Sequence, residues 1–136
     1  MAPTNNDMRL EYITLIASIV LGFGYLFAAV NAATRQRGMA WNAGNREGEE
    51  PLKGAAFRLH QAFGNFRETF PFFAAAILMA GAANRFSTLS AWGTQLYFWA
   101  RLAYLPLYGF GIRYLRSAAW LVSVAGIFLI IAATLL

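Results

Sequence analysis

The feature of this sequence that most constrains its fold is a series of four long stretches with almost no charged side chains. They cover residues 12–34, 69–84, 86–112 and 117–136, and only Arg101 interrupts them. A helix needs about 20 predominantly apolar residues to cross the hydrocarbon core of a bilayer. The second stretch is short, but it continues toward the N-terminus through an amphipathic run from Phe57. The pattern predicts an all-α integral membrane protein in which four helices span the bilayer as a bundle.

The composition agrees with this prediction, because 59% of the 136 residues are hydrophobic and only 12% are charged. About a quarter of the residues of an average soluble domain are charged, so an ordinary globular surface is excluded. We expect a single membrane domain over residues 1–136. Its helices would lie at about residues 10–33, 55–83, 90–110 and 116–136, with one substantial polar loop at about residues 34–54.

The distribution of basic residues predicts how the chain is oriented in the membrane. Two of the predicted connections hold or adjoin most of them: Arg35, Arg37, Arg46, Lys53, Arg58, Arg113 and Arg116. The other side carries only Arg9 and Arg85. By the positive-inside rule the first group is cytoplasmic, and both termini then lie on the non-cytoplasmic side. We interpret the net charge of +5 in this way rather than as a sign of nucleic-acid binding, and expect a bacterial inner-membrane protein.

Polar side chains inside the apolar stretches mark the candidate site. A charged group at membrane depth is costly and is a functional-site hypothesis by default. The second and third predicted helices run antiparallel, and at 3.6 residues per turn each presents one polar face that reaches a depth of roughly 10 Å from the cytoplasmic end. The second helix contributes Arg58, Gln61, Asn65 and Glu68, and the third contributes Arg101, Tyr104 and Tyr108.

Two interpretations of these polar faces remain open. In the structural one, Glu68 and Arg101 pair and fix the register of the helices, with Asn65 as interhelical glue. In the functional one, the faces line a water-accessible cavity open to the cytoplasm. Guanidinium groups, a carboxylate, a carboxamide and two phenols suit a small zwitterion, whose carboxylates arginines bind bidentately. The membrane would supply a lipophilic second substrate.

The motif Asn65-x-x-Glu68-x-x-Pro71 and the motif Arg101-x-x-Tyr104-x-x-x-Tyr108, in this order on a short chain with four spans, resemble the MAPEG family. These are membrane-associated proteins of eicosanoid and glutathione metabolism. The resemblance covers nearly the whole chain. It implies a homotrimer that binds glutathione between neighbouring subunits, and an activity of the glutathione transferase or glutathione peroxidase type on lipophilic electrophiles.

The resemblance also implies roles for individual residues. Asn65 and Glu68 would hold the backbone and amine of glutathione, and Tyr104 and Tyr108 would line its pocket. A carboxylate of glutathione would meet Arg35 or Arg37 of the neighbouring subunit. An arginine near the start of the last helix would stabilise the thiolate, because a nearby cation lowers the pKa of a thiol. Two residues are candidates for this role, Arg116 and then Arg113.

The chain departs from the family pattern at three positions. Gln61 stands where many glutathione-using members carry arginine, Thr69 where the leukotriene-forming branch carries tyrosine, and Phe57 where a glutamate usually precedes arginine. A second hypothesis is therefore a lipid-binding protein of the same fold without catalysis. A third is a small transporter or channel subunit in which Glu68 and Arg101 form a relay.

Other residues are assigned to packing or left open. The single histidine, His60, lies about 100° round the helix from Gln61, which favours an interfacial role over that of a general base. Arg67 also points away from Glu68, and either pairs at a subunit interface or snorkels. With one histidine and no cysteine, the sequence predicts no metal site of the usual kinds.

Overall fold

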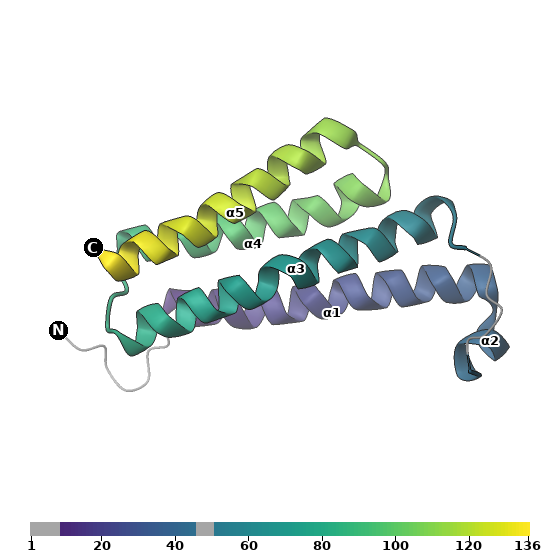
Figure 1. Ribbon diagram of the computed structural model, residues 1–136, viewed down its shortest axis with the longest axis horizontal. Helices are drawn as coiled ribbons and strands as arrows, with labels where there is room; N and C mark the ends of the chain where they lie inside the picture. Colours follow the sequence, from purple (N-terminus) through teal and green to yellow (C-terminus); the bar gives the residue numbers. More distant parts are fainter. Residues whose placement is uncertain (1–8, 46–50) are drawn as a thin grey trace.

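The computed structural model describes residues 9–45 and 51–136, and this part of the chain forms five helices and no strand. In Figure 1 the long helices lie in two pairs, α1 beside α3 and α4 beside α5, and the pairs pack on one another. α1 begins and α5 ends at one end of the molecule, and the connections α1–α3 and α4–α5 lie at the other. The helices are α1 (Leu10–Arg37), α2 (Met39–Ala43), α3 (Gly54–Ala82), α4 (Thr88–Gly109) and α5 (Arg113–Leu135).

The end of α1 differs from the sequence prediction. The helix does not stop at residue 33 but continues to Arg37, and α2 occupies part of the segment that we predicted as loop. We predicted the end of the helix from its last apolar residues. The helix instead continues until Gly38, where the backbone adopts a φ of 96°, a conformation that favours glycine. The Gln36 side chain donates to Pro51 O and accepts from Lys53 N, which ties the end of α1 to the start of α3. Arg46 lies outside the described residues.

Two of the described helices, α1 and α5, are both long and apolar enough to cross a membrane. α3 and α4 are long as well, but polar residues interrupt their apolar character. Large apolar side chains are exposed over the outer surface of all four, as suits a surface that lies against lipid or other helices. Examples are Val20, Phe23, Phe27, Phe72, Trp92, Leu121 and Phe128.

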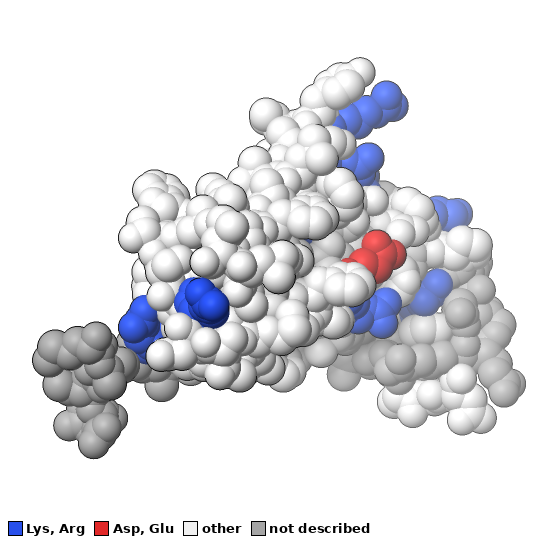
Figure 2. All heavy atoms as spheres, turned by 60° about the vertical axis from the view of Figure 1, so that its left-hand side comes forward, with Lys and Arg blue, Asp and Glu red and all other residues white. Residues whose placement is uncertain are grey.

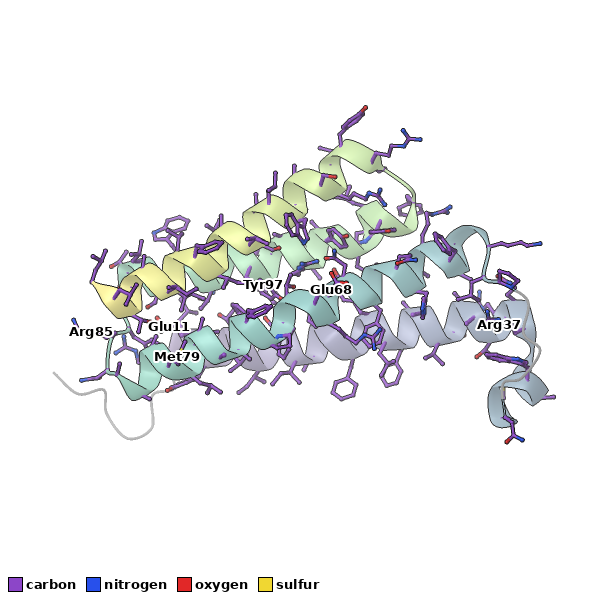
Figure 3. All side chains as sticks on the ribbon, viewed as in Figure 1. Glu11, Arg37, Glu68, Met79, Arg85 and Tyr97 are labelled. Carbon is purple, nitrogen blue, oxygen red and sulfur yellow. The ribbon has the colours of Figure 1, made fainter. Side chains whose placement is uncertain are left out.

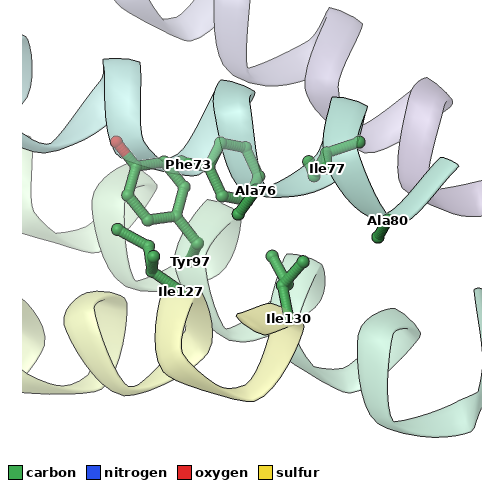
Figure 4. Packing of buried hydrophobic residues seen from close by; sticks show 7 residues of the cluster. All are labelled: Phe73, Ala76, Ile77, Ala80, Tyr97, Ile127 and Ile130. Atoms are coloured by element: carbon green, nitrogen blue, oxygen red, sulfur yellow. The ribbon is translucent and has the colours of Figure 1, made fainter. Parts of the chain in front are cut away.

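The core joins α3, α4 and α5 in the half of the molecule nearer the end of α5. The rings of Phe73 and Tyr97 stack with centroids 3.9 Å apart, and Ile127 and Ile130 of α5 pack against the same cluster (Figure 4). α4 and α5 cross closely at two glycines. A Cβ atom on Gly126 would lie 2.5 Å from Gly93 O, so only glycines permit this approach.

The starts of α1 and α4 are joined at the end where α5 finishes. Ser87 and Ser90 form a capping box that satisfies backbone N–H groups in the first turn of α4. The Ser90 hydroxyl also lies 3.3 Å from Glu11 Oε1, and Glu11 is only 2% exposed. Arg9 Nε lies 4.0 Å from the same carboxylate. These contacts fix α1 against α4 at the end opposite the candidate site.

Candidate functional site

A polar pocket of about 530 Å³ lies between α3 and α5, with α4 as its floor. Pockets for small molecules commonly have volumes of about 300–1,000 Å³. Figure 3 shows Glu68 on the side of α3 that faces α4 and α5. In Figure 2 an acidic group lies among basic side chains toward one end of the visible surface. Further basic groups lie at the opposite end, and the surface between the two ends carries almost no charge. The pocket walls are Gln61, Gly64, Asn65, Glu68, Tyr104, Tyr108, Arg116, Ser117, Trp120 and Leu121.

Arg101 lies beneath this pocket and is fully buried. Its Nη1 donates to Asn65 Oδ1 at 2.7 Å, and its Nη2 donates to Thr69 Oγ1 at 2.8 Å. The Thr69 hydroxyl lies 3.1 Å from the hydroxyl of Tyr97, which extends the network across the interface of α3 and α4. The Arg101 guanidinium also lies 4.8 Å from the ring centroid of Tyr104. Arg101 is not a pocket wall, so it acts on the site through its neighbours.

This network orients Asn65 in the pocket wall. Its Oδ1 accepts from Arg101, which leaves the amide N–H groups of the side chain as donors on the other side. Asn65 is half-buried and forms part of the pocket wall, so these N–H groups are available to a ligand in the pocket. α1 supports the arrangement, because the buried Tyr25 hydroxyl donates to the backbone oxygen of Arg101 at 2.6 Å.

Glu68 does not pair with Arg101, contrary to the structural interpretation of the sequence. Its side chain is exposed in the pocket wall, and within residues 9–45 and 51–136 it forms no ion pair or hydrogen bond. The ion pair observed in this part of the chain joins Arg9 and Glu11 instead. Glu68 therefore presents an uncompensated negative charge to the pocket.

Of the two arginines predicted near the start of α5, Arg116 lies in the pocket wall and Arg113 does not. The Arg116 guanidinium lies over the ring of Tyr108, 4.3 Å from its centroid, so the two side chains form a cation–π interaction. The rings of Tyr104 and Tyr108 are 5.5 Å apart, so α4 contributes a continuous aromatic floor. Arg113, the first residue of α5, is exposed.

The two sequence motifs thus contribute a carboxylate, a carboxamide and two phenols to the site, and Arg116 of α5 adds a guanidinium. A family model compared with the whole chain matches residues 14–136, and it describes the MAPEG family. The chain belongs to the MAPEG family. Its proteins are membrane proteins, they include glutathione transferases and related proteins, and they commonly use glutathione. A search of curated proteins gave no match.

Three other arginines that the sequence analysis assigned to the MAPEG site lie outside the pocket of their own chain. Arg58 Nε donates to Gly109 O at 2.9 Å and so caps the last turn of α4. Arg35 and Arg37 lie at the end of α1, and the Arg37 guanidinium is 4.6 Å from the ring centroid of Trp41. The pocket of a single chain therefore receives none of these three guanidinium groups.

The structure adds residues to the site that the sequence analysis did not identify. Trp120 lies one helical turn beyond Arg116 and supplies an apolar wall. Thr69 lies one turn beyond Asn65 and accepts the second hydrogen bond from Arg101. The helical spacing from each motif residue was the signal that could have found both. Within the described residues, no cluster of three or more histidine, aspartate or glutamate side chains suits a metal ion.

Proposed function

We propose that this chain is a membrane-bound glutathione transferase or peroxidase that acts on lipophilic electrophiles. The observation that carries the proposal is the position of Arg116 in a pocket of about 530 Å³ that also presents Asn65 and Glu68. A guanidinium beside a bound thiol favours the thiolate, which is the nucleophilic form. Family membership supports glutathione as the thiol.

In this proposal α3 recognises the peptide part of glutathione. Glu68 accepts hydrogen bonds from its ammonium group or backbone N–H groups, and the Asn65 amide donates to a carbonyl. Tyr104 and Tyr108 line the floor of the pocket. Charge-assisted hydrogen bonds are about twice as strong as neutral ones, so among the residues of α3 Glu68 would contribute most to the free energy of glutathione binding.

The lipophilic substrate would reach the thiolate from the membrane, past the apolar walls on α5. Trp120 and Leu121 lie in the pocket wall, and Leu121 is exposed on the outer surface of its helix. The thiolate sulfur would form a bond to the electrophilic carbon while the leaving group departs with its electron pair. With a hydroperoxide, the sulfur would attack the terminal oxygen and break the O–O bond, and the alkoxide would leave with the electron pair and take up a proton. A second glutathione thiolate would attack the sulfur of the resulting sulfenic acid, form the disulfide and release water.

We further propose that all four long helices span the inner membrane of a bacterium as a bundle, and that three copies assemble into a homotrimer with both termini on the non-cytoplasmic side. The connections α1–α3 and α4–α5 lie at the same end of the molecule, and most of the basic residues lie there. The positive-inside rule then puts this end, and the polar pocket nearer to it, in the cytoplasmic half.

Lipid binding without catalysis is the second candidate, and Gln61 favours it. This residue lies in the pocket wall as an uncharged side chain, at the position where many glutathione-using members carry an arginine. Loss of a desolvated partner for a carboxylate costs about 2–5 kcal/mol. A pocket with fewer cations therefore holds a peptide dianion less tightly.

The test is calorimetric titration of the detergent-purified protein with glutathione, with the ultraviolet absorbance of the thiolate followed in parallel. We expect saturable binding and a thiolate signal near neutral pH. Arg116→Gln should abolish the thiolate signal, and Arg113→Gln is the matched control that should retain it. Absence of binding at millimolar glutathione would reject the transferase proposal in favour of lipid binding.

A further inference from the structure

An arginine lies on the outer face of α3 in an apolar setting. Arg67 is exposed, its guanidinium lies 4.8 Å from the ring centroid of Phe63, and it forms no hydrogen bond or ion pair within the described part of the chain. It borders a groove of about 450 Å³ between α1 and α3 whose other walls are apolar: Ile19, Gly22, Phe23, Leu26, Phe63, Phe66, Phe70 and Pro71. Toward the end of α1 it also borders a second groove, which Arg37 and His60 share. A charge in such surroundings is costly without a partner.

The depth of Arg67 argues against a lipid headgroup as this partner. Arg58 reaches the carboxyl end of α4 at Gly109, so its level marks one edge of the packed helices. Arg67 lies roughly 13 Å deeper along α3 at 1.5 Å per residue. Half of a hydrocarbon core measures about 15 Å, so the backbone of Arg67 in a membrane-spanning α3 lies near the middle of the bilayer. The guanidinium turns back about one helical turn toward Phe63 and still lies at the depth of the hydrocarbon core. Lipid phosphates lie at the surface.

Glu68 is the complementary charge at the same depth. It has no ion pair within the described residues either, and it opens into the polar pocket rather than the apolar groove. Consecutive residues of a helix differ by only about 1.5 Å in height but by about 100° in direction. Arg67 and Glu68 therefore do not face each other within one chain. They mark two different faces of α3 with opposite charges.

A cyclic assembly brings these two faces together. When copies are related by an axis along the membrane normal, each residue keeps its depth, and one face of a copy meets a different face of the next copy. Arg67 of one copy then meets Glu68 of its neighbour at equal depth. In a closed ring, Arg67 of each copy pairs with Glu68 of the next copy, so each of these charges has a partner.

The polar pocket also needs a further cation. Within the described part of the chain, Arg116 is the single cationic residue in its wall, and Gln61 is neutral. Glutathione carries two carboxylates in addition to its thiol, so Arg116 alone cannot serve all three groups. We propose that Arg67 of one copy enters the open side of the polar pocket of the next copy, pairs with Glu68 and supplies the cation that Gln61 does not. The pairing rests on the proposed cyclic assembly, and the role in ligand binding rests in addition on the proposed use of glutathione.

Cross-linking tests the pairing without reference to the ligand. The chain has no cysteine, so single cysteines are specific labels. Differently tagged Arg67→Cys and Glu68→Cys chains are produced together and treated in membranes with a short bis-maleimide. We expect a covalent dimer that carries both tags.

The control replaces Arg67→Cys with Leu78→Cys, which is also exposed. Leu78 lies about 20° round α3 from Arg67 and roughly 16 Å deeper, so it shares the face but not the depth. This pair should give at least tenfold less product with Glu68→Cys. A mixed dimer no more abundant than the control, or none at all, would overturn the pairing and indicate that something other than a second copy covers Arg67.

Glutathione titration tests the role in binding. Arg67→Gln should raise the Kd about tenfold or more, while Arg67→Lys, which keeps the charge, should raise it less. Gln61→Arg in the Arg67→Gln background should restore affinity, which a purely structural role of Arg67 would not predict. Unchanged affinity of Arg67→Gln rejects the role in binding. If the wild-type chain binds no glutathione and the cross-link still forms, the pairing stands and the proposed function fails.

Discussion

The hydrogen-bond network beneath the pocket makes a prediction about Thr69. Thr69→Val keeps the shape of the side chain but removes the hydroxyl that accepts from Arg101 at 2.8 Å and contacts the Tyr97 hydroxyl at 3.1 Å. Arg101 is fully buried, and its Nε already has no partner within the described residues. Loss of Thr69 Oγ1 would leave a second N–H group of a buried cation without an acceptor.

The expected magnitude follows from the surroundings of this hydrogen bond. Hydrogen bonds between membrane helices contribute about 0.6 kcal/mol on average and up to about 1.7 kcal/mol. Hydrogen bonds to charged groups contribute about 1.5–3 kcal/mol in proteins generally. Since the donor is a buried guanidinium, we expect Thr69→Val to lower the free energy of unfolding by about 2 kcal/mol.

Thr94→Val is the matched control, because Thr94 is also a buried threonine but its hydroxyl donates to Ala91 O of its own helix. Such local hydrogen bonds add little stability, so we expect a loss of about 0.5 kcal/mol or less. The free energy is measured by reversible unfolding in mixed micelles of a mild detergent and dodecyl sulfate. Equal losses for the two variants would refute the assignment of Thr69 as a partner of Arg101.

A double-mutant cycle separates this interaction from the loss of packing. Arg101→Met removes the donor and keeps an unbranched side chain of similar length. Residues that share a hydrogen-bond network have coupling energies of about 0.5–3 kcal/mol. We expect a coupling of about 1 kcal/mol or more between Thr69→Val and Arg101→Met. A coupling near zero would mean that the 2.8 Å contact contributes nothing to stability.

Two further predictions concern the pocket and the helix crossing. Glu68→Gln and Arg101→Ala should each weaken glutathione binding more than His60→Ala does, as measured by calorimetry; if His60→Ala is the most damaging while the protein stays folded, the site is misplaced. Gly126→Ala should lower the free energy of unfolding by about 1–3 kcal/mol, because the added Cβ would lie 2.5 Å from the backbone of α4. Gly24→Ala, where a Cβ meets nothing within 4 Å, should have little effect in the same unfolding assay.

Much of the site follows from helical spacing. Asn65 and Glu68 are three residues apart and Tyr104 and Tyr108 are four apart, so each pair had to share a face. The structure places all four in one pocket. What the spacing does not give is the direction of a face relative to the other helices. That direction depends on how closely the helices approach, which is decided by contacts such as the crossing of α4 and α5 at Gly93.

Arg58 and Arg101 show where spacing fails. Arg58 belongs to the same face as Gln61, yet at its level α4 has ended, and the guanidinium caps that helix instead of entering the pocket. Arg101 shares a face with Tyr104, but this face turns toward the core at its depth, so the side chain is buried below the pocket floor. In both cases the height of the residue along the helix axis decides what surrounds its side chain. A helical wheel shows only the direction around the axis and not this height.

The two arginines at the site, Arg101 and Arg116, have different surroundings and therefore different roles. Arg101 is buried, and among the residues that the structure describes it contacts no carboxylate. Asn65 and Thr69 fix two of its nitrogens, so its charge strengthens hydrogen bonds that orient the pocket wall. Arg116 lies in the wall itself, where its charge can act on a ligand. A buried cation without an anion is costly, and a purely structural role would be served as well by an apolar side chain. The presence of Arg101 is better explained by the orientation it imposes on Asn65 than by stability.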